Sequence, residues 1–421
     1  MNTIDKYLDL TDSQQDNLSA LTLNAKTANY DDLECAFKLK IEGKNLTIKA
    51  QHVLHQLMNG TINLNYYYEW CSHHFLNRDN HIFIFELSES KATQTQVKKF
   101  FTEKNLKSNT VNLFDYNKSN LNNIELVHYK KSINETLMTF IVPVKKIIIK
   151  DNETTFINEQ YFCYAWVLAN TNQLIWSLPP LTNIVTFNNI NIKRGAYDTV
   201  ISILTSSIKI KLGNLDFNQP KWLLKTLHHI TNDYYNHHND IISQKSKEIT
   251  TTEISNLLDS FQKLDEAFKQ LSVRNRVKKE LQELIENELV LAYGYNTHRD
   301  NVPFEIYWHF SEKGTTNYTA NNKEHSIEFN ESRRIIKMML TNSQTSGLGI
   351  IYNFESVSYP YKIFQEHNYV CLKNTSNKTT KKEVVDNVLS ELKKYRSRDE
   401  SKAIVQPSET VGRINNNNTS Q

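Results

Sequence analysis

The stretch from Gln160 to Ile192 most constrains the fold of this chain, because it carries no charged residue yet is interrupted by polar residues and prolines. Two short, aromatic and β-prone runs, residues 161–168 and 174–178, flank a polar tetrad and are followed by Pro179-Pro180. Neither run reaches the roughly 20 apolar residues of a membrane-spanning helix. We therefore expect a buried β-hairpin here, and no insertion into a membrane.

Composition narrows the class of protein. The 421 residues allow two or three domains. A net charge of +3, from 49 Lys+Arg against 46 Asp+Glu, is too small to make nucleic-acid binding the default, although nucleic acid stays open as a partner. Four cysteines lie far apart without a CxxC pair, which disfavours a zinc site and a disulfide framework. Together with a polar, acidic N-terminus, this favours a cytoplasmic protein.

Glycine is scarce, with 9 residues in the whole chain, and phosphate-binding loops are missing from the sequence. There is no GxxxxGK[ST], and no GxGxxG between a strand and a helix. The nearest approach, Gly347-Leu348-Gly349, is expected in a turn before a strand at residues 350–352. We expect no cofactor.

The periodicity of apolar residues changes along the chain. Strand-like alternation dominates up to the two prolines, a helical period follows, and strands then return. The expected fold class is α+β, multidomain, with a β-rich N-terminal domain resembling a sandwich or barrel (1–180), a central helical bundle (181–294) and a small C-terminal α/β domain (295–378). A charged helix and a disordered tail complete the chain (379–421).

One segment of the predicted bundle carries a heptad pattern of apolar residues. Its members recur at spacings of three and four: Ile254, Leu257, Phe261, Leu264, Phe268 and Leu271. The pattern predicts one helix, with a break in phase at residues 274–276. The seam either packs inside the chain's own bundle or forms a self-associating coiled coil.

The best candidate for a metal site is His229, Asp233 and His237, which recur every four residues and share one face of a helix predicted from Trp222 to Ile242. No HExxH or CxxC accompanies them, so a solvated polar face is the alternative and we expect no bound metal. Glu86 and Glu89, near Lys91, have a spacing typical of nuclease cores, but no metal-binding aspartate precedes them. No catalytic residue is therefore assigned, and the chain is not expected to be an enzyme.

Basic residues form five short clusters that could assemble a groove for nucleic acid, or could simply be solvated. They lie at residues 98–99, 130–131, 145–146, 274–279 and 393–398.

Three motifs, in order, resemble TssK, the trimeric baseplate protein of type VI secretion systems. Glu42-Gly43 followed by residues 48–52 is similar to that family's N-terminal E-G…L-x-P-Q-H. Residues 138–151, followed by Phe156, resemble its Pro-Val/Ile strand and the following strand, and residues 178–181 resemble the Pro-Pro before its helical domain.

The resemblance implies a non-enzymatic structural subunit that links the baseplate to the membrane complex, and it implies a homotrimer. Gln51, His52 and Pro143 would then face other baseplate proteins. Residues 295–373 would meet the membrane complex. The trimer contacts would come from the heptad residues Leu257, Phe261, Leu264, Phe268 and Leu271. The alternative function is a nucleic-acid-associated factor of a mobile or defence element, including a nuclease.

Overall fold

The fold was analysed in a computed structural model of the chain. It describes residues 10–23, 25, 27–76, 79–111, 122–133, 135–151, 153–168, 172–212, 215–236, 240–293, 303–313, 316–321, 336, 340, 344–366, 368–376 and 381–404.

A single sheet of 13 strands organises the described part of the chain, and every pairing between its named strands is antiparallel. Its main order is β10-β9-β11-β12-β13-β1-β5-β4-β3-β6-β7, with β2 paired to β3 and β8 to β1. The strands are β1 (His81–Leu87), β2 (Glu125–Lys131), β3 (Glu135–Lys150), β4 (Glu153–Leu168), β5 (Gln173–Leu178), β6 (Ile184–Phe187), β7 (Ile190–Asn191), β8 (Phe217–Asn218), β9 (Phe304–Lys313), β10 (Thr316–Asn321), β11 (Gln344–Phe354), β12 (Val357–Gln365) and β13 (Tyr369–Asn374).

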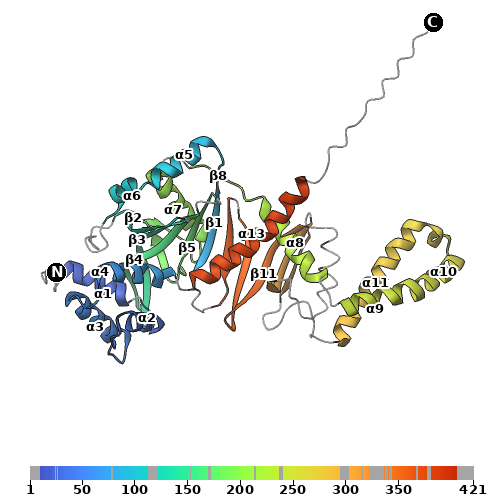
Figure 1. The fold of residues 1–421 in the computed structure, drawn as a ribbon, viewed down its shortest axis with the longest axis horizontal. Coiled ribbons are helices and arrows are strands. Elements are labelled where there is room, and N and C mark those ends of the chain that lie inside the picture. Colours follow the sequence, from blue (N-terminus) through green and yellow to red (C-terminus); the bar gives the residue numbers. More distant parts are fainter. Residues whose placement is uncertain are drawn as a thin grey trace, which may run out of the picture.

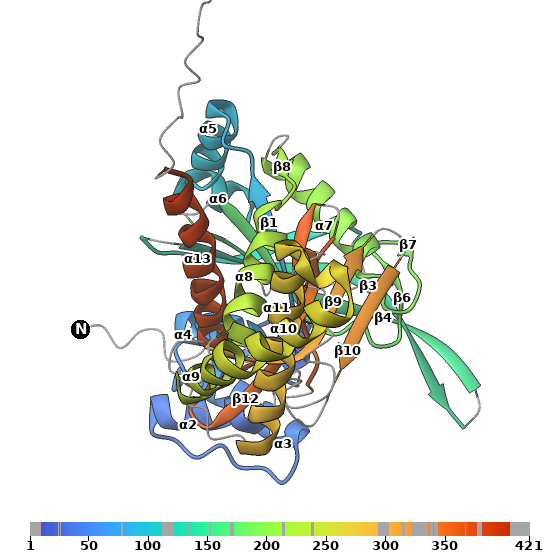
Figure 2. The ribbon, with the colours of Figure 1, turned by 90° about the vertical axis from the view of Figure 1, so that its right-hand side faces the viewer.

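Helices lie on both faces of this sheet, and one group projects away from it (Figure 1). The helices are α1 (Asp12–Leu23), α2 (Thr27–Phe37), α3 (Leu46–Met58), α4 (Leu64–Leu76), α5 (Lys91–Phe100), α6 (Glu103–Asn109), α7 (Tyr197–Leu212), α8 (Trp222–Asn236), α9 (Asp240–Ile249), α10 (Ser255–Leu264), α11 (Leu271–Tyr293) and α13 (Lys382–Ile404). The projecting group consists of α9, α10 and α11, and Figure 2 looks along it toward the sheet.

Two apolar cores sandwich the sheet, because alternate side chains of each strand point to opposite faces. In β1, Ile82 and Ile84 point into one core, which also contains residues of α1 to α4, α8 and α13. Phe83 and Phe85 point into the other core, which α6 and α7 cover. Since β1 is buried on both faces, it is a central strand of the described sheet.

The predicted fold class is wrong. β1 pairs on one side with β5 and on the other with β13, in a register that joins Ile84 to both Ile175 and Val370. Strands expected in a β-rich N-terminal domain and strands expected in a small C-terminal α/β domain therefore share one sheet. The N-terminal strands are neither a sandwich nor a barrel, and the helices of the expected central bundle are divided between the sheet and the projecting group.

Several local predictions are confirmed. β4 and β5 form the expected hairpin, in which Tyr164 pairs with Ser177. The strand predicted at residues 350–352 lies within β11, and the charged helix predicted beyond residue 379 is α13. Among the residues that the structure describes, none of the helices combines the length and hydrophobicity needed to span a bilayer.

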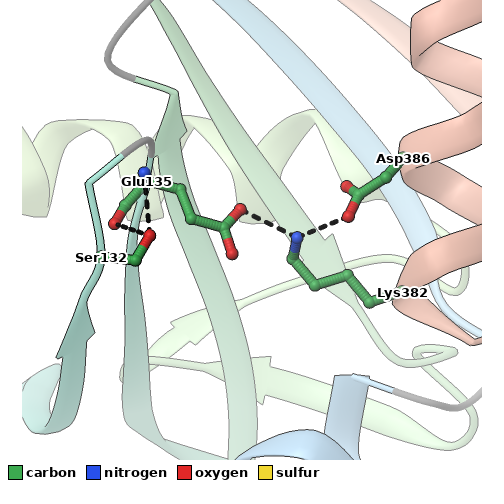
Figure 3. A network of polar contacts seen from close by, with 4 residues as sticks. All are labelled: Ser132, Glu135, Lys382 and Asp386. Carbon is green, nitrogen blue, oxygen red and sulfur yellow. Dashed lines mark hydrogen bonds and ion pairs between the residues drawn. The ribbon is translucent and has the colours of Figure 1, made fainter.

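The C-terminal helix α13 is fixed across the sheet by ion pairs at its first residue and in its second half. The Lys382 ammonium donates to the carboxylates of Glu135 on β3, at 2.8 Å, and Asp386, at 2.7 Å (Figure 3). Glu135 is itself positioned by Ser132, whose hydroxyl accepts from the Glu135 amide and donates to its carbonyl. Toward the other end, Arg396 pairs with Glu86 on β1. Burial raises the pKa of Asp386, and the two carboxylates raise the pKa of Lys382 against the opposing effect of burial.

We expect Lys382→Met to lower the free energy of unfolding by about 1 to 3 kcal/mol, because it leaves two partly buried carboxylates without their cation. Asp386 is partly exposed, so water recovers some of the loss. Lys394→Met is the matched control, since that lysine is largely exposed on the same helix and should change stability by less than about 0.5 kcal/mol. Equal effects of the two variants in urea denaturation would contradict this role of Lys382.

Candidate functional site

The projecting group is a helical hairpin. Its first arm runs from α9 through a π-helical turn (Thr250–Ile254) into α10, and α11 is its return arm. A row of side chains spaced four residues apart faces the return arm and is buried: Ser246, Thr250, Ile254 and Leu258. The Ser246 hydroxyl also donates to the carbonyl of Gln282 on α11. The hairpin therefore has a small core of its own.

The hairpin turns at Asp265, so the helix predicted across the whole heptad pattern is wrong. Asp265 is extended, with φ of −146°, and its carboxylate accepts from the Ala267 amide at 2.8 Å. This local hydrogen bond caps a short 3-10 helix, Glu266–Lys269, before α11 begins. Aspartate competes in this way for backbone donors that would otherwise continue the helix. Residues 274–276, where the phase of the pattern breaks, lie inside α11.

Arg274 joins the two arms just behind the turn. Its guanidinium pairs with the Asp259 carboxylate at 2.5 Å and donates to the Gln262 side chain at 3.0 Å. It also reaches the Leu258 carbonyl at 3.4 Å. These contacts from one side chain to three residues of α10 fix the geometry of the tip.

The tip exposes a stripe of leucines. Leu257 is 42% exposed, Leu264 83% and Leu271 71%. At about 100° per residue, Leu257 and Leu264 point in nearly the same direction, whereas the buried Leu258 points about 100° away. Phe261 and Phe268 lie beside the stripe with ring centroids 5.2 Å apart. The apolar face of α10 is thus wider than the hairpin can bury by itself, and we call these five residues the apolar tip.

The residues that the TssK resemblance assigns to baseplate contacts lie elsewhere. Gln51 is exposed on α3, and His52 is half-buried beside it. The His52 ring accepts from the Glu42 amide at 3.0 Å and contacts the Gln56 amide at 2.9 Å. Pro143 lies within β3, where its carbonyl accepts from the Asn188 amide. None of these contacts involves the apolar tip.

The metal candidates are only partly described. His229 and Asp233 are half-buried on α8, while His237 lies outside the described residues. No group of three metal-binding side chains occurs within the described ranges. Sequence reasoning missed a different histidine in this region, His309 on β9, which is buried beneath α8 and lies within 3.3 Å of the Thr345 hydroxyl. Burial, together with the neighbouring His228, lowers the pKa of His309 to about 4.

The remaining charged candidates lie apart or are engaged in structural contacts. Glu86 pairs with Arg396, whose guanidinium also lies 5.1 Å from the centre of the Trp222 ring. Arg396 and Trp222 border a cavity of about 530 Å³ beneath α13, together with Glu89 and the two carboxylates that bind Lys382. Four of the five basic clusters contain a residue paired with a carboxylate, through Lys130, Lys146, Arg274, and Lys394 with Arg396. The five clusters lie on five different elements: α5, β2, β3, α11 and α13.

The four cysteines are free thiols, and three of them, Cys71, Cys163 and Cys371, are buried. Burial raises the pKa of each of these three thiols, so none is poised as a nucleophile at neutral pH.

Two comparisons with known proteins identify no relative of this chain. A scan against protein-family models finds no match for the chain, and a search of curated proteins finds none either.

Proposed function

We propose that this chain is a non-enzymatic structural protein that assembles into homo-oligomers through the apolar tip of its helical hairpin. The exposed stripe of Leu257, Leu264 and Leu271 is the observation that carries the proposal. Burying one leucine side chain contributes about 1.5 to 3 kcal/mol, so contact between tips would gain several times that amount. Exposed apolar side chains gathered in one region of a molecule are typical of interaction sites.

A second copy of the chain is the partner that fits best. The exposed charges near the tip include both signs, with Lys263 and Lys269 close to Asp265 and Glu266. A surface of mixed charge can meet its own copy in a symmetric arrangement, in which acids face bases. A strongly acidic or strongly basic partner would meet like charges.

The short motifs shared with TssK extend this proposal to a baseplate subunit of a type VI secretion system, with other baseplate and membrane-complex proteins as partners and a cytoplasmic location. That extension predicts a trimer. It rests on the motifs alone, because the three-part architecture implied by the resemblance is not the fold of this chain.

The double variant Leu264→Asp/Leu271→Asp tests the proposal, because both side chains are largely exposed and their replacement leaves the folded chain intact. We expect light scattering to show an oligomer for the unmodified protein and a species near the single-chain mass of 49.3 kDa for the variant. Ile133→Asp is the matched control, since Ile133 is 96% exposed at the turn between β2 and β3. A monomeric unmodified protein, or an oligomer that survives the double substitution, would contradict the proposal.

A further inference from the structure

A second surface crosses β9, β11, β12 and β13 on the sheet face opposite the core that α8 and α13 cover, and Leu224 of α8 lies at its border. Two adjacent rows of directly paired residues cross these four strands. The first row is Trp308, Gly349, Lys362 and Lys373, and the second is Phe310, Gly347, Phe364 and Cys371. The residues that alternate with them, such as Ile350 and Ile363, point into the core beneath the helices. The two rows therefore share one face of the sheet.

The two glycines allow the Trp308 side chain to pack closely against β11. A Cβ atom on Gly347 would lie 2.7 Å from the far edge of the indole ring, and one on Gly349 would lie 2.5 Å from the Trp308 Cβ. Any larger residue would displace the tryptophan, so glycine here serves close approach between a side chain and a strand. The Phe310 ring is nearly parallel to the indole, at 12°, with centroids 6.0 Å apart. The result is an aromatic platform built into the sheet.

Two lysines flank this platform. Lys362 and Lys373 are directly opposite each other on β12 and β13. Two lysines in directly opposed positions concentrate positive charge at one point of the sheet, which favours the binding of an anion. The Lys362 ammonium lies 4.5 Å from the centre of the Trp308 ring, so a cation already contacts one face of the indole.

These side chains line an open groove of about 690 Å³, within the size range of small-molecule sites. Phe364 completes its aromatic part, and the Gln219 and Gln365 side chains supply amides that can both donate and accept. One carboxylate, that of Glu366, also borders the groove. The lining thus combines flat rings, neutral hydrogen-bonding groups, a pair of cations and one carboxylate.

We infer that this groove binds single-stranded nucleic acid, with bases stacked on the aromatic platform and a phosphate between Lys362 and Lys373. A ligand that is planar and apolar on one side and anionic on the other matches both halves of the lining. Stacking of unpaired bases on aromatic side chains beside basic residues is the general means by which proteins hold single strands. A base on Trp308 takes the place of the Lys362 ammonium, which then reaches the phosphate. This inference concerns a different surface from the apolar tip and does not depend on the proposed function.

Fluorescence anisotropy with a labelled oligothymidine or oligouridine of about 12 nucleotides tests the inference on the full chain. We expect binding that weakens as salt increases. Lys362→Glu/Lys373→Glu should weaken it by at least about tenfold, and should make the dependence of log affinity on log salt shallower by about 0.7 for the one lost phosphate contact. Lys98→Glu/Lys99→Glu makes the same change in net charge on α5, and should leave affinity within about twofold.

Trp308→Ala is the second variant and removes stacking without changing charge. We expect it to weaken binding by about 5- to 150-fold, after circular dichroism has confirmed that the variant is folded. Failure of both oligonucleotides to bind, or binding that neither groove variant weakens, would overturn the inference. Displacement of the oligonucleotide by an acidic peptide that binds more tightly would also overturn it, since the groove would then serve a protein partner.

Discussion

Ile84→Ala is expected to lower the free energy of unfolding by about 2 to 5 kcal/mol, the usual cost of truncating a fully buried isoleucine to alanine. Ile84 is 1% exposed and lies on the central strand β1, which is hydrogen-bonded to β5 on one side and to β13 on the other. A cavity at this position removes contacts from both halves of the sheet. The same loss of stability should therefore reach strands that are far apart in the sequence.

Hydrogen exchange measures that loss in each half separately. We expect amides of β5 and β12 to lose protection equally in the Ile84→Ala protein, because a single sheet opens as one unit. Ile148→Ala is the matched control, since Ile148 is 41% exposed near the far end of β3 and should cost less than about 0.5 kcal/mol. Loss of protection in β5 alone would show two independent units in place of one sheet.

Mild acid is expected to destabilise the protein through two buried histidines, His81 and His309. Burial lowers the pKa of each to about 4, from an ordinary value of 6.5. Between these values the unfolded chain binds a proton that the folded chain does not, so stability falls as the pH falls. From about pH 7.5 to pH 5 the loss amounts to about 2 kcal/mol for each histidine.

His309→Asn isolates one of these contributions. His309 faces His228 from α8 and the Thr345 and Ser311 hydroxyls from the sheet. None of these contacts is with a carboxylate that could stabilise the protonated ring. We expect the variant to lose about 2 kcal/mol less than the unmodified protein between the two pH values, whatever its stability at neutral pH. His81→Asn should do the same independently. Urea denaturation at each pH measures the difference. If acidification lowers the stability of both variants as much as that of the unmodified protein, the two histidines are not the cause.

Local elements of this fold are predictable from the sequence, whereas their assembly is not. The hairpin of β4 and β5 has two apolar β-prone runs close together, so its pairing has a local signal. The pairing of β1 with β13 joins segments from opposite ends of the sequence, and no local pattern specifies it. The sequence shows two regions of strands with helices between them, and this order is compatible with one sheet as well as with separate domains.

The candidate sites show the same contrast between features with a local sequence signal and features that depend on assembly. The heptad pattern identifies the leucines of the apolar tip, but the turn at Asp265 lacks glycine and proline and so gave no stop signal. The aromatic groove was missed because its residues come from four strands. Gly347 and Gly349 were expected in a turn before the strand, and both lie inside β11. Two glycines spaced two apart in a strand share one face, and this spacing is the signal for a ring lying against the sheet.

A distance measurement between hairpin tips tests the central claim most directly. A spin label at Lys263→Cys, in a protein whose exposed Cys35 has been replaced by serine, places one probe on each apolar tip while the three buried cysteines stay unlabelled. We expect strong dipolar coupling between copies, lost when Leu264→Asp and Leu271→Asp are added. A label at Ile133→Cys should couple more weakly. Absence of coupling at the tip in an oligomeric sample would contradict assembly through the hairpin.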